Sequence, residues 1–498
     1  MDVVPAGTPH DPTQLPNAQK ALALAGTLLG MLLAALDQTI VATAGPAIQR
    51  DLAIAPSLYT WITTSYLVAS TVCVPIWGKL SDALGRRRIL LAGIGVFLLG
   101  SVLCGVSGSA VQLILFRAIQ GIGSASLFTS AFTVIADLFV PTERGRYQGI
   151  FGAAFGLSSV VGPLLGGFLT DTVGWHWCFF VNMPLGAIAI IFILARMPPL
   201  RRPQARPLTL DVAGAVTLAL FAVPLLLGLS LGRLQARPGD TGWPWLSWQI
   251  GAFFAVALAG LVAFLLVEGR ARDPIVDLRL LRLRVVAAGL TVNFLAGLGF
   301  LGAIVFLPLF MVYVAGASAT SAGLTTLPLT MGLLVANITS GQIASRTGRT
   351  KPLLVGSVGF ACLGFLLLAL TLDTTSTASA VGWRMFLLGV GLGPAIPLVP
   401  LTMQNAVPPP VMGAVTSLST FFRQMGATMG LAVLGTVFAA SLAVPGLPIG
   451  EGSSPPDAAA LAHADPAAVA ALKAAFVHAV TRTFYFAAAF QGLAFLAV

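Results

Sequence analysis

The sequence GKLSDALGRRR, residues Gly78–Arg88, returns 263 residues later as GQIASRTGRTK, residues Gly341–Lys351. The two glycines of each copy have the same spacing, and a basic run closes both copies. Each copy also lies between two long apolar runs. Repeats of this size are one of the known plans of membrane transporters, in which two parallel halves build one molecule. The repeat therefore predicts a chain made of two similar halves.

The composition predicts that the chain crosses a membrane many times. Of its 498 residues, 57% are hydrophobic and only 9% are charged, whereas soluble domains carry about 25% charged residues. The apolar residues form about fourteen runs of roughly 20 residues, the length that crosses a bilayer as a helix. The predicted fold class is an all-α polytopic membrane protein with 14 transmembrane helices. The runs begin near Ala21, Ser57, Ile89, Val111, Tyr147, Cys178, Leu208, Ser247, Val285, Thr320, Pro352, Gly382, Ala414 and Thr481.

The distance between the two copies predicts two further helices between the halves. Six spans and their loops need about 200 residues at ~20 residues per span, so the repeat leaves room for two more. We expect a cytoplasmic tail over 1–20, a six-helix bundle over 21–200, an inserted helix pair over 201–270 and a second six-helix bundle over 271–498. The stretch near 441–478, rich in Ala, Pro and Gly, is predicted to be an extracytoplasmic loop with a short helix from Ala467.

The basic residues predict the orientation. With the N-terminus in the cytoplasm, about 19 of the 27 Lys and Arg residues lie on the cytoplasmic side, which is the positive-inside bias. Because they lie in short loops between apolar runs, the net charge of +10 does not indicate nucleic-acid binding. The first 20 residues lack a basic start and a cleavage site, so we expect the first span to be retained. The predicted location is the inner (cytoplasmic) membrane. The sequence ends at Val498 without a basic tail. A longer natural C-terminus is therefore one alternative.

No cofactor or metal is expected. The four cysteines lie in or beside apolar runs without metal-like spacing, and are typical of packing residues. The stretches GVGLGP and GIGSAS do not follow a strand and lack the lysine of a nucleotide-binding loop. The missing lysine argues against an ATP-driven pump. Nothing in the sequence indicates oligomers, and we expect a monomer.

Asp37, in LDQTIVATAGP (Leu36–Pro46), lies about 16 residues into the first apolar run. A charge at this depth is costly and usually functional, and burial favours the protonated form of a carboxylic acid. The structural alternative is a side chain that reaches an interface. Asp37 is the only acid well inside a predicted span. Two arginines, Arg117 and Arg423, are rival or alternating partners, and the sequence does not rank them.

Five stretches together resemble the major facilitator superfamily, and within it the fourteen-helix drug:proton antiporter family. They are LDQTIVATAGP, GKLSDALGRRR, RAIQGIGSA (Arg117–Ala125), GPLLGG (Gly162–Gly167) and WHWCFFVNMPLG (Trp175–Gly186). The chain departs from the family pattern at Ala42, where Asn is usual, and at His176, where Arg is usual. The resemblance implies the major facilitator fold, here two six-helix halves plus two inserted helices.

The resemblance also implies roles for two groups of residues. A cytoplasmic gate would consist of Gly78, Asp82, Gly85, Arg86, Asp137 and Arg144. The antiporter motif would consist of Gly162, Pro163, Gly166 and Gly167. Their structural alternatives are solvated loop charges and ordinary helix packing. The second repeat copy has Ser345 where Asp82 stands, so we expect no equivalent charged lock in the second half.

These observations predict a proton-coupled multidrug efflux antiporter that exports lipophilic, often cationic, compounds by alternating access. Its partners would be small lipophilic substrates, protons and the lipid bilayer. Candidate cavity residues are Trp61, Tyr66, Gln120, Asn293, Phe294, Phe300 and Phe306, although aromatic residues in spans more often pack or face lipid. One alternative is a dedicated exporter of one metabolite, lipid or antibiotic. A membrane-embedded enzyme or a scaffold is another, and an enzyme would need a cluster of catalytic groups that these spans do not offer.

Overall fold

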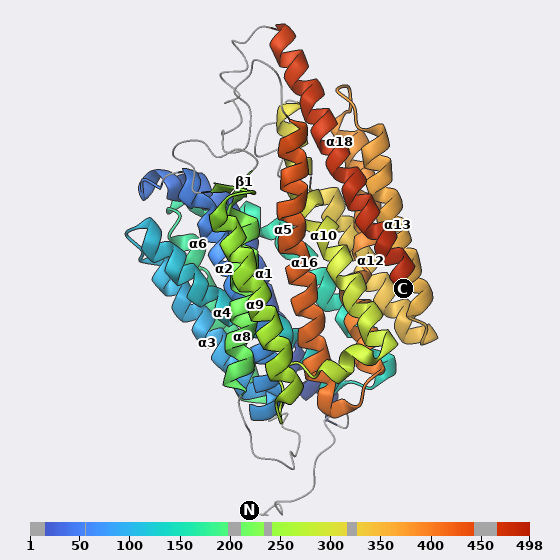
Figure 1. The fold of residues 1–498 in the computed structure, drawn as a ribbon. Helices are drawn as coiled ribbons and strands as arrows, with labels where there is room; N and C mark the ends of the chain where they lie inside the picture. Colours follow the sequence, from blue (N-terminus) through green and yellow to red (C-terminus); the bar gives the residue numbers. More distant parts are fainter. Residues whose placement is uncertain (1–14, 55, 198–210, 234–241, 316–325, 443–465) are drawn as a thin grey trace, which may run out of the picture.

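Long helices that run roughly along one axis make up almost all of the protein (Figure 1). The computed structural model describes residues 15–498 except 55, 198–210, 234–241, 316–325 and 443–465. Every backbone group in a bilayer core needs an internal hydrogen-bond partner, and helices supply it within each span. The only strands in the described residues are β1 (Gly232–Arg233) and β2 (Trp243–Pro244), a short parallel pair.

The helices form two sets with an additional pair between them in the sequence. The first set is α1 (Asn17–Asp51), α2 (Pro56–Leu84), α3 (Arg86–Gly105), α4 (Ala110–Leu138), α5 (Pro141–Thr172), α6 (Trp177–Phe180) and α7 (Asn182–Arg196). The additional pair is α8 (Val212–Leu231) and α9 (Trp248–Arg270). The second set is α10 (Arg284–Tyr313), α12 (Leu327–Thr347), α13 (Lys351–Thr371), α14 (Ala378–Leu392), α15 (Ala395–Asn405), α16 (Met412–Ser441) and α18 (Pro466–Ala497), with short 3-10 helices at Leu278–Arg282 and Pro409–Val411.

Thirteen helical segments in the described residues are long and apolar enough to cross a membrane. They correspond to the first thirteen predicted runs, with α6 and α7 sharing one span and α14 and α15 another. The fourteenth predicted run lies in α18, which is long enough but is not among the thirteen. Polar side chains dilute this helix: Lys473, His478, Arg482 and Gln491.

The last helix begins where the short helix was expected but is longer. A loop near 441–478 was expected to become a short helix from Ala467, ahead of the last span near Thr481, whereas α18 runs without a break from Pro466 to Ala497. Its first half is rich in alanine, the residue with the highest helix propensity, so the helix extends beyond the apolar run. Residues 443–465 of the predicted loop lie outside the described part of the chain.

Each set has its own apolar core, and the two sets meet along two seams. Phe97, Phe132 and Phe151 are buried in the first set, and the second set buries its own cluster, including Phe310, Phe365 and Phe484. Between the sets, α2 packs against α16 and α5 packs against α12. We call these contacts the α2–α16 seam and the α5–α12 seam.

The repeated glycines have the same structural role in both copies. Gly85 follows α2 with φ of 95°, and Gly348 follows α12 with φ of 66°; both angles strain a residue that has a Cβ. Gly78 lies against Ser417 in the α2–α16 seam, and Gly341 lies against Gly145 in the α5–α12 seam. One glycine of each copy thus ends a helix, and the other lets that helix approach the opposite set. We call the membrane side that carries these two loops the basic side.

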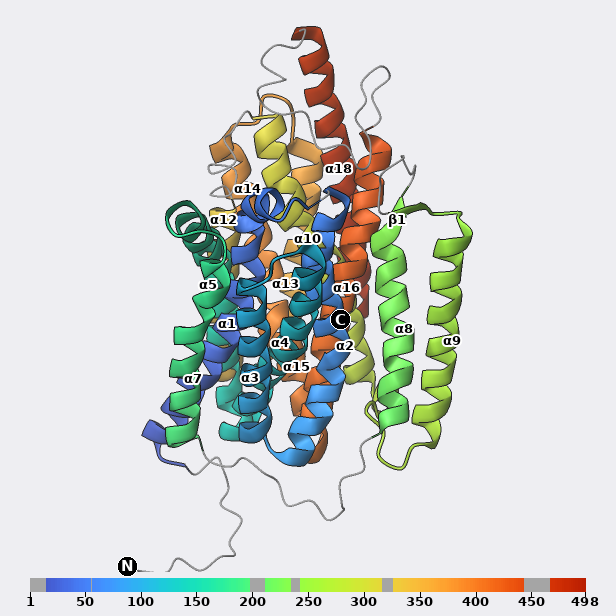
Figure 2. The same cartoon turned by 90° about the vertical axis from the view of Figure 1, so that its left-hand side faces the viewer.

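The additional pair stands at the edge of the bundle, with α9 outermost (Figure 2). Helix α8 contacts both α2 and α16, while α9 packs mainly on α8. The buried residues of α8 include Gly214, Leu218, Ala222 and Leu226, which recur every four residues and so form one face. Lys79 of α2 also pairs with Asp273, just after α9. The pair is therefore fixed over the α2–α16 seam through α8.

Candidate functional site

Asp37 lies in the middle of the first set and is fully buried. Its Oδ2 is 2.5 Å from Arg117 Nη1 of α4. Its Oδ1 accepts hydrogen bonds from Gln120 Nε2 at 2.8 Å and from Asn182 Nδ2 of α7 at 3.1 Å. We call these four residues the Asp37 site. Three donors from two other helices thus contact the two oxygens of one carboxylate.

A second layer of groups supports the Asp37 site. Ser101 of α3 accepts from Gln120 Nε2 at 3.1 Å and from Asn182 Nδ2 at 2.9 Å, and donates to Phe179 O at 2.8 Å. The ring of Tyr66 lies under the Arg117 guanidinium, 4.2 Å from its centre. A buried ion pair is tolerated only when further hydrogen bonds satisfy it. Here Gln120, Asn182 and Ser101 supply these hydrogen bonds. Removal of either charge would therefore change the hydrogen bonds of all three residues.

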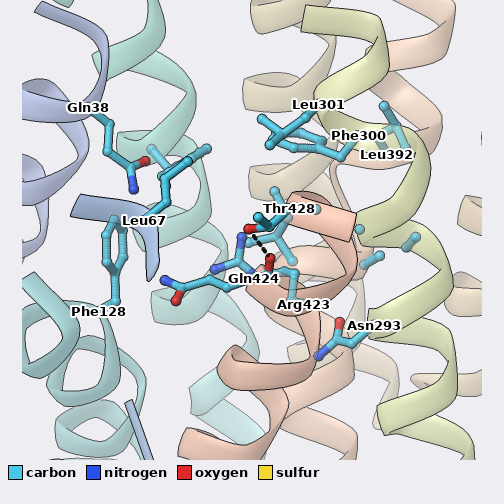
Figure 3. Close-up of a pocket in the computed structure, with 16 residues that line it drawn as sticks. Gln38, Leu67, Phe128, Asn293, Phe300, Leu301, Leu392, Arg423, Gln424 and Thr428 are labelled. Atoms are coloured by element: carbon cyan, nitrogen blue, oxygen red, sulfur yellow. Dashed lines mark hydrogen bonds between the residues drawn. The ribbon is translucent and has the colours of Figure 1, made fainter. Parts of the chain in front are cut away.

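The structure pairs Asp37 with Arg117 and places Arg423 elsewhere. Arg423 belongs to α16, in the other helix set, and lines a central cavity (Figure 3). In the described part of the chain, no hydrogen bond or ion pair reaches its guanidinium. In this conformation, therefore, Arg117 pairs with Asp37, whereas Arg423 lines the central cavity.

The central cavity lies between the two helix sets. Its empty space, counted with the open solvent at its mouth, is about 760 Å³. The first set contributes Gln38, Leu67, Phe128 and Phe155. The second set contributes Asn293, Ala296, Gly297, Phe300, Leu301, Leu392, Ala395, Ile396, Arg423, Gln424, Ala427 and Thr428. Arg423 and Gln424 extend from α16 into the space between the sets (Figure 3).

Two of the seven candidate cavity residues, Asn293 and Phe300, line this cavity. Tyr66 and Gln120 belong instead to the surroundings of Asp37, and both are fully buried. The remaining three are not among the lining residues: Trp61 is half-buried in α2, Phe294 packs against Phe422 and Phe306 stacks on Phe438. Sequence reasoning missed Gln38, although it directly follows Asp37 and therefore connects the two sites along one helix.

The antiporter motif brings α5 against the part of α1 that follows Asp37. Gly162 has no room for a Cβ next to Thr39, and at Gly166 a Cβ would lie 2.6 Å from Ile40 O. Thr39 Oγ1 donates to Ser158 O of α5 at 2.9 Å. Pro163 lies inside α5, whereas Gly167 faces open space. Two of the three motif glycines thus bind α5 closely to α1, and α5 in turn forms a seam with α12.

Charged residues cluster at the end of the α2–α16 seam on the basic side. Arg86 pairs with Asp82 and, through Nε, with Asp137 Oδ2 at 2.8 Å. The side chain of Arg86 is only 3% exposed, so these charges are packed and not solvated. Asp82 also leaves no room for a Cβ at Gly413, in the first turn of α16. A carboxylate at a helix N-terminus is favourable, so Asp82 binds the first set to the second.

Arg144 connects the two sets through other groups. It donates from Nε to Phe139 O at 3.0 Å and from Nη1 to Asn405 Oδ1 of α15 at 3.1 Å. Nearby, Gln148 of α5 donates to Gln404 of α15 at 2.7 Å, and Gln404 donates to Thr416 of α16 at 2.8 Å. The contacts of Arg144 and Gln148 with α15 thus connect the two sets beside the α5–α12 seam.

The second repeat copy has the neutral residue Ser345 at the position of Asp82, and this residue also contacts the opposite set. Ser345 Oγ accepts a hydrogen bond of 2.8 Å from the backbone N–H of Arg146 in α5. Asp82 meets the start of α16, and Ser345 meets the start of α5. The second copy lacks the charge, but Ser345, at the position equivalent to Asp82, still connects the two sets.

Comparison with known proteins identifies the family. Residues 27–431 match the family described as Major Facilitator Superfamily. The chain belongs to this superfamily. Its members are transporters, and the protein is a multi-pass membrane transporter rather than an enzyme.

The chain is 39% identical over 421 residues to the multidrug transporter protein MdtP of Bacillus subtilis, covering 84% of this chain and 76% of that protein. It is also 39% identical over 428 residues to multidrug resistance protein 3 of the same organism, covering 86% and 81%. Among solved structures, the human organic anion transporter MFSD10 shares the fold, with a TM-score of 0.65 over 97% of this chain and 100% of that chain, at 17% identity.

Proposed function

We propose that this transporter is a proton-coupled multidrug exporter of the fourteen-helix drug:proton antiporter family, with Asp37 as the proton-carrying residue. The observation that carries the proposal is the fully buried Asp37–Arg117 pair, one residue before the cavity residue Gln38. Relatives that are 39% identical are named for multidrug transport and resistance, which supports export as the direction.

Coupling would work through the charge of Asp37. A ligand shifts a conformational equilibrium only if it binds the two states differently. A proton on Asp37 removes a negative charge, weakens the bond to Arg117 and relaxes the hold of α4 and α7 on α1. Because Gln38 faces the cavity and Thr39 contacts α5, this change would reach both the cavity and the seams.

We further propose that the basic side faces the cytoplasm, with the N-terminus on the same side. The clusters around Arg86 and Arg144 would then close the cytoplasmic side of the cavity, and the conformation described here would face outward. Protonation of Asp37 from outside would favour the inward-facing state, in which the seams on the basic side separate. The proton would be released inside as a substrate molecule is taken up for export.

Transport by everted membrane vesicles tests this proposal. A panel of fluorescent lipophilic dyes with negative, zero and positive charge is offered with and without an imposed pH gradient. We expect gradient-driven accumulation of at least one dye by the wild type and none above protein-free background by Asp37→Asn. The amide replaces the carboxylate with little change of shape, so the variant should remain folded.

Asp373→Asn is the matched control. Asp373 is an exposed carboxylate between α13 and α14, and hydrogen bonds from Ser376 and Thr375 hold its pKa below the ordinary value. Its removal should leave accumulation unchanged. Accumulation by Asp37→Asn at the wild-type rate would refute the role of Asp37. Accumulation by the wild type that is independent of the pH gradient would refute proton coupling, and accumulation of one compound only would favour a dedicated exporter.

A further inference from the structure

Arg423 is the only charged side chain among the sixteen residues that line the central cavity. It is half-buried, and its guanidinium is not engaged by any hydrogen bond or ion pair within the described residues. Arginine keeps its proton even inside proteins, and a charge with little access to water is costly unless it is paired. A bound molecule with a negative charge would lower that cost.

Asp37 does not supply the counter-charge in this conformation. It is fully buried, its two oxygens already accept from three side chains, and it is not among the lining residues. The polar residues that share the cavity with Arg423 are uncharged: Gln38, Asn293, Gln424 and Thr428. The charge presented to a molecule in the cavity is therefore positive.

The remaining walls are apolar and come from both helix sets. Leu67, Phe128 and Phe155 face Phe300 and Leu301 across the cavity, and the rings of Phe155 and Phe300 are 6.3 Å apart. The side-chain amide of Asn293 already donates hydrogen bonds to Ser419 O and Oγ, at 3.1 and 2.6 Å. The lining thus combines a lipophilic surface with one fixed cationic group.

We propose that the cavity binds lipophilic organic anions: molecules with an aromatic or aliphatic body and one carboxylate or similar group that pairs with Arg423. Guanidinium and carboxylate fit each other through two parallel hydrogen bonds, which makes Arg423 a selective contact and not merely a point charge. The inference rests on the proposed export function but concerns only the class of substrate. It replaces the expectation that substrates are often cationic.

Binding of three pyrene probes, which share the ring and a four-carbon chain and differ in the head group, tests the proposal. They are 1-pyrenebutanoate, 1-pyrenebutanol and 4-(1-pyrenyl)butyltrimethylammonium. Affinity is measured by fluorescence on purified protein in lipid nanodiscs at constant pH, with empty nanodiscs as the blank. The buffer holds only a low concentration of salt, so that small anions compete little for Arg423. We expect the butanoate to bind the wild type roughly 10- to 100-fold more tightly than the butanol, as a hydrogen bond to a charged group implies.

Three variants locate the effect. In Arg423→Gln, the butanoate should lose its advantage while the butanol binds as before, which also shows that the cavity is intact. In Arg423→Lys, which keeps the charge but not the planar fork, part of the advantage should remain. Arg482→Gln removes the same charge from an exposed position on α18 and should leave all three affinities unchanged.

Several results would overturn the proposal. One is a butanoate that binds the wild type no better than the butanol, whether both bind or neither does. Others are tighter binding of the ammonium probe and a charge preference that survives in Arg423→Gln. The binding assay uses no proton gradient, so these results would not bear on the role of Asp37, which the vesicle experiment tests separately. Conversely, loss of proton coupling in vesicles would not change the charge preference in nanodiscs.

Discussion

Asn182 of α7 donates hydrogen bonds to the carboxylate of Asp37 and to Ser101. Asn182→Ala removes one donor to the carboxylate, and a hydrogen bond to a charged group contributes ~1.5–3 kcal/mol. The loss leaves one oxygen of the Asp37 carboxylate with a single remaining side-chain donor, Gln120. We expect the initial rate of dye exchange at a fixed pH gradient to fall roughly 10-fold, whereas the amount of folded protein stays unchanged.

Asn17→Ala, at an exposed position in the first turn of α1, serves as the control and should keep the wild-type rate. A wild-type exchange rate in Asn182→Ala would contradict the idea that this amide supports the Asp37 site. A lower amount of folded protein would indicate only a structural role.

The sequence predicted the central residue of the site but not all of its partners. Asp37 stood out because a carboxylate is rare at that depth, and Arg117 because its depth is similar. Gln120 lies three residues after Arg117 and therefore on the same helix face, a signal that could have assigned it to Asp37. The choice between Arg117 and Arg423 depends on which way each helix face points, and packing between helices decides that.

At the scale of helices, the α2–α16 seam gives a prediction about the conformational equilibrium. Gly78→Val places side-chain atoms where Ser417 lies, and Asp82→Asn removes the charge beside Gly413 and Arg86. Both changes weaken the closed seam, so both should shift the population toward the state that is open on the basic side. The measurement is thiol labelling of Thr416→Cys, at a fully buried position, in a variant without the four native cysteines.

We expect the labelling rate of this reporter to rise several-fold in either variant. Gly356→Val is the control, because no atom lies within 4 Å of a Cβ at that position, and it should label at the original rate. Equal labelling in all variants, with transport intact, would contradict this prediction. The charged cluster would then serve only to set the orientation of the helices in the membrane.

Helices were easier to predict than their interruptions. Apolar runs located thirteen spans, because bilayer thickness dictates length and hydrophobicity together. The break between α14 and α15, at Gly393–Pro394, and the one between α6 and α7, near Val181, fall inside apolar sequence. Hydrophobicity alone does not predict such breaks. Pro394 could have indicated one of them, because proline disrupts a helix. The short strands β1 and β2 likewise left no pattern of alternating residues.

For the whole molecule, the orientation in the membrane can be tested directly. Arg349 lies exposed on the basic side, between α12 and α13, and Thr374 lies exposed between α13 and α14, at the other end of α13. If the positive-inside rule holds here, a membrane-impermeant thiol reagent added to intact cells should label Thr374→Cys and not Arg349→Cys. Everted vesicles should give the reverse pattern. Labelling of Arg349→Cys in intact cells would invert the proposed topology.

The two-set arrangement could be anticipated from the repeat, and the placement of the additional pair could not. A repeat with matching glycines implies that both copies end a helix and meet the opposite half, as Gly78 and Gly341 do. The helices α8 and α9 are apolar on every side, and in a lipid environment such faces do not reveal which one binds protein. Only the close packing of α8 identifies its partner helices.

That packing has a mechanical consequence. Helix α8 touches α2 in one set and α16 in the other. Under the proposed alternating access, the two sets would rotate against each other, and α8 could follow one of them only if its contact with the other changed. The buried residues Leu218, Ala222 and Leu226 of α8 are aliphatic and carry no charge, so these residues would lose only apolar contacts. The additional pair would then add an elastic resistance to the rotation without an ion pair to break on this face.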